Sequence, residues 1–174
     1  MIDAELPYSE PVRLHQVGSG LNRRLEPDEA LRARIARSLD LASLDAFVVD
    51  IALAPSATGW RLAGRIHAEA VQTCGITLEP LPVVIDDDFS VVLSETVPDP
   101  EDITDVEITV EDESPDVVED GRIDLGQYAV EQLALRLDPF PRKPGAEFVQ
   151  PPEPGDISPF AVLRQLKTDD SGEG

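Results

Sequence analysis

The chain has 174 residues, of which 35 are Asp or Glu and 14 are Lys or Arg, so its formal net charge is −21 and its pI is about 4.2. This excess of negative charge disfavours binding to DNA or to anionic membranes. No stretch reaches the roughly 20 apolar residues of a membrane-spanning helix, and a single cysteine, Cys74, cannot form an internal disulfide. We therefore expect one cytoplasmic domain, without a membrane or DNA partner.

The first elements predicted are a short edge strand and a helix. Residues Tyr8–Gln16 alternate between two faces, and two prolines within this run disfavour a central strand. A helix is predicted after Pro27, with apolar residues at Leu31, Ile35 and Leu39. The same region is rich in arginine, which makes it our candidate for a secondary contact with RNA, through Arg23, Arg24, Arg32, Arg34 and Arg37.

The next elements are predicted to form a four-stranded meander. Residues 47–53 and 60–70 alternate between apolar and polar positions on either side of a Pro-Ser-rich turn, which is typical of an antiparallel hairpin. A second pair of strands is expected at 81–85 and 89–93. The three aspartates between them, Asp86, Asp87 and Asp88, are interpreted as a turn.

Negative charge is concentrated in residues 66–121, which contain 17 acidic residues and no Lys or Arg. Such a run is either a solvated stretch that maintains solubility or a docking surface for a basic protein. Residues 95–121 are predicted to be a long acidic excursion, with an acidic edge strand at 103–110. The candidate protein-binding residues are Asp86, Asp87, Asp88, Glu101, Asp102, Glu111, Asp112 and Glu113.

A second helix is predicted from Asp124, capped by Asp124 and Gln127 and ending before Pro139. It should cover the apolar face of the sheet. The predicted fold is therefore α+β, with an antiparallel sheet of about four to six strands, as a meander or partly open barrel, packed by two helices in a domain at 1–138. A Pro-rich extended segment is expected at 139–157, a short helix at 158–168 and a disordered tail at 169–174.

The sequence contains no recognisable catalytic or metal-binding constellation. His15 and His67 are expected to face solvent, and no Gly-rich phosphate loop is present. A calcium loop around Asp116–Gly121 is rejected because Val118 occupies a ligand position and Gln127 replaces the closing glutamate. We therefore predict no catalytic residue, no metal and no cofactor.

Three segments carry a family resemblance. They are VQTCGITLEPL (Val71 to Leu81), GRIDLGQYAVEQLALRLDPFPRKPG (Gly121 to Gly145) and SPFAVLRQLK (Ser158 to Lys167). The first resembles the C-x-R-C region of the YceD family of large ribosomal RNA subunit accumulation proteins, and the last is similar to that family's closing signature. The motif residues here are Cys74, Thr77, Leu78 and Pro80, and the signature residues are Pro159, Phe160, Leu163, Leu166 and Lys167.

The resemblance implies a non-catalytic role in ribosome biogenesis that supports accumulation of large-subunit ribosomal RNA. Thr77 stands where the family has its second motif cysteine, so no metal site is carried over, because one thiolate does not fill a tetrahedral site. The expected partner is a basic ribosomal protein or assembly factor bound by the acidic surface. The alternatives are a divalent-metal-binding or hydrolytic enzyme that uses the acidic region, and a direct RNA-binding module that uses the arginine-rich helix. For the terminal signature, docking on the domain's own core and recognition of a partner groove both remain open.

Overall fold

A computed structural model describes residues 6–57, 59–95 and 115–148 of the chain. The chain divides into two compact units, Met1–Pro144 and Gly145–Gly174, and the elements below belong to the first. Within the described ranges, no helix is both long and apolar enough to cross a membrane.

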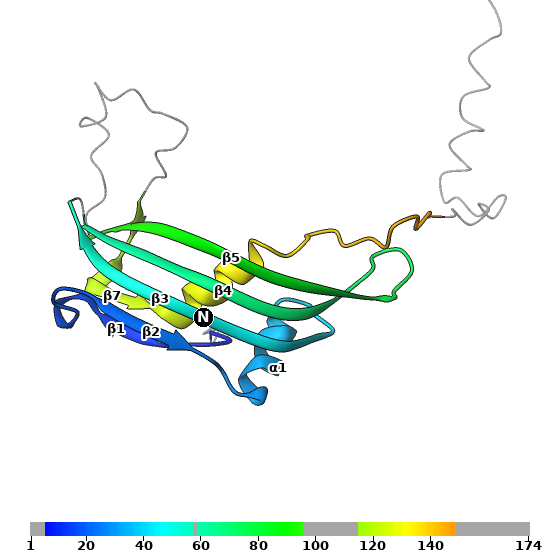
Figure 1. Cartoon of the computed structure of the whole chain (residues 1–174), viewed down its shortest axis with the longest axis horizontal. Helices are drawn as coiled ribbons and strands as arrows, with labels where there is room; N and C mark the ends of the chain where they lie inside the picture. The colour runs from blue at the N-terminus through cyan, green and yellow to red at the C-terminus, as the bar shows by residue number, and fades with distance from the viewer. Residues whose placement is uncertain (1–5, 58, 96–114, 149–174) are drawn as a thin grey trace, which may run out of the picture. The chain divides into compact units, whose positions relative to one another are not determined.

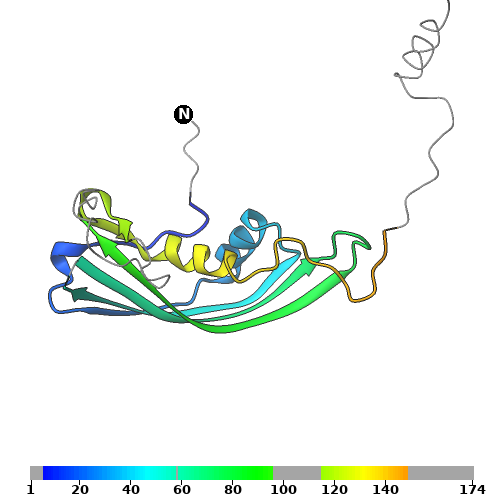
Figure 2. The same cartoon turned by 90° about the horizontal axis from the view of Figure 1, so that it is seen from above.

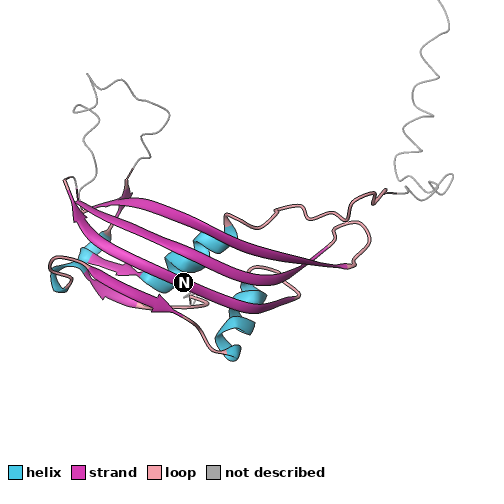
Figure 3. Cartoon of the chain, viewed as in Figure 1, coloured by secondary structure: helices cyan, strands magenta, loops and turns pink. Residues whose placement is uncertain are grey.

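The main sheet has five strands in the order β2-β3-β4-β5-β6 (Figure 1). Neighbouring strands are antiparallel except for β5 and β6, which are parallel. Strand β1 (Pro11–Arg13) pairs with β7 (Arg122–Asp124) in a separate two-stranded sheet. The strands of the main sheet are β2 (Leu21–Leu25), β3 (Ser43–Ser56), β4 (Gly59–Thr73), β5 (Pro80–Ser94) and β6 (Asp116–Val117). The fold is therefore α+β with an open, mostly antiparallel sheet, as predicted (Figure 3).

The predicted hairpin is the centre of the sheet. Strands β3 and β4 pair from Ser43↔Val71 to Ser56↔Gly59, so their connection is short. Alternate residues of both strands are buried on one face, because side chains point to opposite sides of a strand. These buried residues are Phe47, Val49, Ile51 and Leu53 of β3 and Leu62, Ile66, Ala68 and Ala70 of β4.

Two helices cover that face, as Figure 2 shows from above. Helix α1 (Glu29–Ser38) begins after Asp28, whose side chain accepts the backbone N–H of Leu31. Helix α2 (Leu125–Ala134) begins after Asp124, which accepts the N–H of Gln127 at 3.0 Å, so Asp124 caps the helix as predicted, while the Gln127 side chain donates to Glu131. The helices bury Ile35 of α1 and Leu125, Ala129 and Leu133 of α2.

The three aspartates do not form a turn, so this prediction was wrong. Asp86, Asp87 and Asp88 lie within the single 15-residue strand β5, opposite His67, Ile66 and Arg65 of β4. Aspartates favour turns. Here they stay in a strand because β4 offers an unbroken hydrogen-bonding edge and Arg65 lies directly opposite Asp88. The predicted four-stranded meander is instead a sheet of three long strands with short edge strands on each side.

Two further elements differ from the prediction near the N-terminus. The strand expected at 8–16 is limited to β1, and Leu14–Gln16 forms a 3-10 helix with Leu14 buried. Strand β2 was not predicted, because four of its five residues are not fully buried and its sequence, LNRRL, lacks an apolar alternation. Pairing with β3 along its whole length makes it a strand.

The C-terminal half of the first unit is more ordered than its composition indicated. At the end of the excursion expected at 95–121, residues 115–121 contain β6 and a 3-10 helix at Glu119–Gly121. Helix α2 ends at Ala134, before Pro139. The edge strand expected at 103–110, the helix at 158–168 and the tail at 169–174 lie outside the described residues.

Candidate functional site

The two strands that flank the acidic segment 96–114 in the sequence pair with each other. Strand β5 ends at Ser94 and β6 begins at Asp116, and the two strands pair at Leu93↔Asp116 and Ser94↔Val117. The N–H of Val118 donates to the carbonyl of Ser94 at 2.8 Å. Between these strands, residues 96–114 contain eight Asp or Glu residues and no Lys or Arg. The candidates Glu101, Asp102, Glu111, Asp112 and Glu113 lie there, outside the described residues.

A hollow of about 460 Å³ is lined by residues that follow the acidic segment in the sequence. Its charge is predominantly negative, like that of the segment. Four acids, Asp116, Glu119, Asp124 and Glu131, and one base, Arg122, contribute to its lining. Tyr128 donates a hydrogen bond from its hydroxyl to Asp116 Oδ2 at 3.2 Å. Burial of this hydroxyl, together with the charge of Asp116, raises the pKa of Tyr128, which therefore remains a neutral donor at physiological pH.

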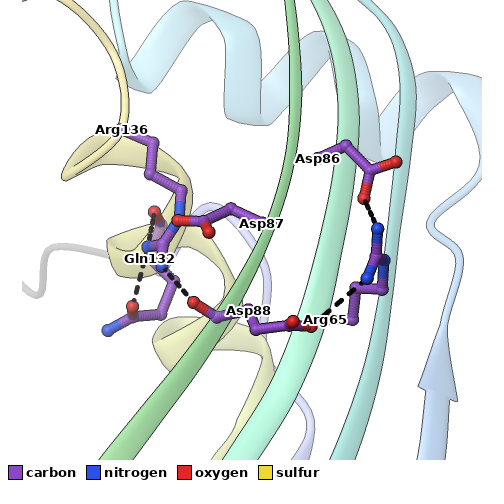
Figure 4. A network of polar contacts seen from close by, with 6 residues as sticks. All are labelled: Arg65, Asp86, Asp87, Asp88, Gln132 and Arg136. Carbon is purple, nitrogen blue, oxygen red and sulfur yellow. Dashed lines mark hydrogen bonds and ion pairs between the residues drawn. The ribbon is translucent and has the colours of Figure 1, made fainter.

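The three aspartates of β5 are paired with arginines of the fold (Figure 4). Asp86 and Asp88 contact Arg65 of β4, with N–O distances of 2.7 and 3.7 Å. Asp87 accepts from Arg136 Nε at 2.8 Å on the other face of the sheet. Arg136 also donates to the carbonyl of Asp88 at 2.9 Å and to Gln132. Two arginines thus offset much of the negative charge that the sequence places at this position.

On the uncovered face of the sheet, the charges alternate in sign across four strands. Arg24 of β2 lies opposite Asp50 of β3, Asp50 opposite Arg65 of β4, and Arg65 opposite Asp88 of β5. Arg24 Nη1 and Asp50 Oδ2 are 2.9 Å apart. Such cross-strand pairs stabilise a sheet modestly and leave this row nearly neutral.

The arginines of the predicted RNA-contact region lie on two elements. Arg23 and Arg24 lie on β2, and Arg32, Arg34 and Arg37 lie on α1. Several are engaged within the fold. Arg32 donates to the carbonyl of Pro27 at 2.9 Å, and Arg34 donates to the carbonyl of Leu6. The α1 surface is therefore a weaker RNA candidate than its composition indicated.

Cys74 follows β4 directly and is completely buried. Its Sγ accepts the backbone N–H of Thr77 at 3.4 Å and that of Lys143 at 3.3 Å. These donors favour the thiolate. The pKa of Cys74 is lowered from 9.0 to about 6, chiefly by the Thr77 side-chain hydrogen bond and then by the backbone donors of Lys143 and Thr77, against the opposing effect of burial.

The other two motif residues, Leu78 and Pro80, do not contribute to this thiol environment. Leu78 is 76% exposed and adopts a left-handed conformation with φ 60° in the loop between β4 and β5. Pro80 is the first residue of β5. The structure therefore brings Cys74 and Thr77 together, and it leaves Leu78 as a surface residue.

The loop that contains Cys74 is tied to the segment after α2. The N–H of Gly75 donates to the carbonyl of Pro141 at 2.9 Å, and Gln72 Nε2 donates to the carbonyl of Asp138 at 2.8 Å. Lys143 Nζ lies 2.8 Å from Glu79 Oε1. The start of the segment expected at 139–157 is therefore hydrogen-bonded to the loop after β4. Sequence reasoning missed Lys143, because 69 residues separate it from Cys74.

Within the described ranges, no three His, Cys, Asp or Glu side chains are grouped so that they could hold a metal ion. His67 lies on the uncovered face near Glu69 and Asp86, at 3.8 and 4.0 Å. The signature residues Pro159, Phe160, Leu163, Leu166 and Lys167 lie outside the described part of the chain.

Comparison with known proteins gives a match to a family model. No curated protein and no solved structure matches the chain significantly. A family model described as "Large ribosomal RNA subunit accumulation protein YceD" matches residues 62–167. The match begins within β4, includes the Cys74 loop, the acidic segment and α2, and extends through the terminal signature. The chain therefore belongs to the YceD family of large ribosomal RNA subunit accumulation proteins.

Proposed function

We propose that this protein supports the accumulation of large-subunit ribosomal RNA by binding a basic ribosomal or assembly protein through the acidic segment 96–114 and the adjoining acidic hollow. Family membership supports the biological role. The observation that carries the mode of action is the placement of eight acids and no base between two strand ends that pair with each other. Such a protein would act in the cytoplasm, where its ribosomal partners are made.

Charge decides the class of partner. An uninterrupted anionic segment attracts a Lys-rich and Arg-rich protein over a distance of about 10 Å at 0.1 M salt, and it repels the phosphates of bare RNA. The acidic hollow adds Asp116, Glu119, Asp124 and Glu131 from the described residues to this negative charge. The β5 aspartates contribute less, because Arg65 and Arg136 are paired with them. Binding should therefore be fast and sensitive to salt.

The test compares two variants with the same loss of charge. In the first, the acids Glu101, Asp102, Glu111, Asp112 and Glu113 become amides. In the control, an equal number of acids outside the segment become amides, at Asp3, Glu5, Glu153, Asp156 and Asp169. The tagged full chain and both variants are used to capture partners from nuclease-treated lysate at low and high salt. Each captured protein is then purified, and its affinity for the full chain and for each variant is measured by titration.

We expect the full chain and the control to bind a basic large-subunit protein or assembly factor at low salt, and the segment variant to bind it much more weakly. Equal binding by both variants would show that net charge alone governs association. Recovery of RNA without any basic protein would refute the proposed mode of action.

A further inference from the structure

A second hollow, of about 400 Å³, lies where β1, β2 and β7 meet, and its charge has the opposite sign. Three of its lining residues are arginines, Arg13, Arg23 and Arg122, and none of the lining residues is acidic. In a chain with a net charge of −21, this is an unexpected concentration of positive charge. Sequence reasoning singled out Arg23 but not Arg13 or Arg122, which are 109 residues apart and come together only through the β1–β7 pairing.

The pairing places like charges side by side. Arg13 and Arg122 are direct partners across the antiparallel β1–β7 ladder. Cross-strand partners have Cβ atoms about 5 Å apart, and like charges in such positions destabilise a sheet. Arg23 joins them from the edge strand of the larger sheet. The fold thus gathers three cations from three strands at some cost in stability.

Within residues 6–57, 59–95 and 115–148, these three side chains form no ion pair, although the acids of the neighbouring hollow lie near Arg122. In that part of the chain, six other arginines are occupied, whereas Arg37 and Arg142 also form no side-chain ion pair or hydrogen bond. Arg24, Arg65 and Arg136 form ion pairs, and Arg32, Arg34 and Arg61 donate hydrogen bonds. Arg13, Arg23 and Arg122 have neither kind of side-chain partner among the described residues. Their guanidinium donors are free to bind an anion.

We propose that Arg13, Arg23 and Arg122 form a binding site for the phosphate groups of a single-stranded RNA backbone. Guanidinium groups match phosphate oxygens in geometry and charge, and several from separate strands can hold successive phosphates. Gln16 adds a neutral polar side chain to the lining, and Val12, Val17 and Leu21 add apolar surface against which a ribose or base can pack. The site contains no aromatic platform, so it should read the backbone rather than the base sequence.

The site lies beside the acidic hollow, because Arg122 lines both. Acids near Arg122 would repel RNA on that side and favour a basic protein there. An RNA strand and a basic protein could therefore be bound next to each other. This inference goes beyond the proposed function and does not depend on it, since RNA binding can be measured without any protein partner.

The test is fluorescence anisotropy with the full chain and a labelled single-stranded RNA of about 12 nucleotides, a length within the range of single-strand binding sites. The test variants are Arg23→Gln and the double variant Arg13→Gln/Arg122→Gln. The control Arg142→Gln removes one charge, as Arg23→Gln does, at an exposed arginine that does not line the hollow. The control Arg32→Gln/Arg37→Gln removes two charges from α1, as the double variant does from the hollow. Unfolding by urea is measured in parallel.

We expect the double variant to bind the labelled RNA at least about tenfold more weakly than the parent chain. The slope of the logarithm of the association constant against the logarithm of the salt concentration should become shallower by roughly 0.7 for each arginine removed. Both controls should bind like the parent chain, and RNAs of different sequence should bind alike. The double variant should be at least as stable as the parent, because the substitution removes a pair of like charges. Weaker binding therefore could not be attributed to unfolding.

Three outcomes would overturn the inference. RNA that binds no better than inorganic phosphate would show a site for a free anion rather than for a nucleic acid backbone. An equal loss in Arg142→Gln would show a general charge effect. A loss in Arg32→Gln/Arg37→Gln, with the double variant unaffected, would assign the RNA contact to α1.

Discussion

Arg136 Nε donates to Asp87 Oδ2 at 2.8 Å, and this contact joins the segment just after α2 to the face of β5 that the helix covers (Figure 4). The Arg136 side chain is only 18% exposed, and it also donates to the carbonyls of Asp88 and Gln132. One arginine therefore connects the last turn of the helix to the strand that leads into the acidic segment. The contact has consequences for the stability of this part of the fold.

Arg136→Gln should lower the free energy of unfolding by about 1–2 kcal/mol, since it removes charged hydrogen bonds from a largely buried donor while Asp87 stays in contact with water. Urea denaturation monitored by circular dichroism would measure the change. Arg142→Gln is the control, because no described side-chain contact of Arg142 is lost, and it should be nearly neutral. Equal stability of the two variants would contradict a stabilising role for Arg136.

Asp124→Ala should destabilise the protein by about 1–2 kcal/mol, because Asp124 caps α2 and also fastens the N-terminal segment. Its carboxylate accepts the N–H of Gln127 at 3.0 Å and of Glu10 at 2.8 Å, and the hydroxyl of Ser9. Asp124→Asn keeps an oxygen acceptor at the cap and should retain most of the stability in thermal unfolding. If the two substitutions were equally damaging, charge rather than capping would be the cause.

Gly64→Ala should destabilise the sheet by about 1–3 kcal/mol through overpacking. A Cβ at this position would lie 2.5 Å from the carbonyl oxygen of Asp50 and 2.8 Å from the Phe89 ring, and the Asp50 carbonyl belongs to the neighbouring strand β3. The control is Gly75→Ala, where the nearest atom would be 3.8 Å away, and it should be tolerated. Chemical denaturation of both variants checks this. Full stability of Gly64→Ala would show that the strands can separate locally.

Cys74→Ser should reveal a contribution to stability that depends on pH. The folded-state pKa of about 6 lies below the ordinary value of 9.0, so the thiolate stabilises the folded chain. This contribution is complete above about pH 9, declines as pH falls, and is absent below about pH 6. The difference in melting temperature between the parent and the Ser variant should therefore widen from pH 6 to pH 9. A constant difference would show that the thiol stays protonated throughout this range.

The sequence was most informative where one local pattern and the tertiary contacts agree. The alternation in 47–53 and 60–70 specified both strands and their buried faces, because one face of this hairpin packs on the helices while the other meets water. Asp124 and Gln127 marked the start of α2 correctly, since a cap involves only neighbouring residues.

The prediction failed where a distant partner decides the local structure. Strand β2 is polar along most of its length and is recognisable only through its pairing with β3. Asp86–Asp88 have the composition of a turn, and yet Arg65 and Arg136, from β4 and the end of α2, hold them in a strand. The thiol environment of Cys74 likewise depends on Lys143, which no spacing rule connects with it.

The sequence by itself determined the α+β class, the central hairpin, both helices and the concentration of negative charge between residues 66 and 121, because these follow from periodicity and composition. The tertiary structure decided which charges are already paired and which are free. It neutralised much of the charge at Asp86–Asp88 and gathered Arg13, Arg23 and Arg122 from three strands around one hollow. Charge is a property of composition, but whether a charge is available to a partner depends on strand register, which only the folded chain fixes.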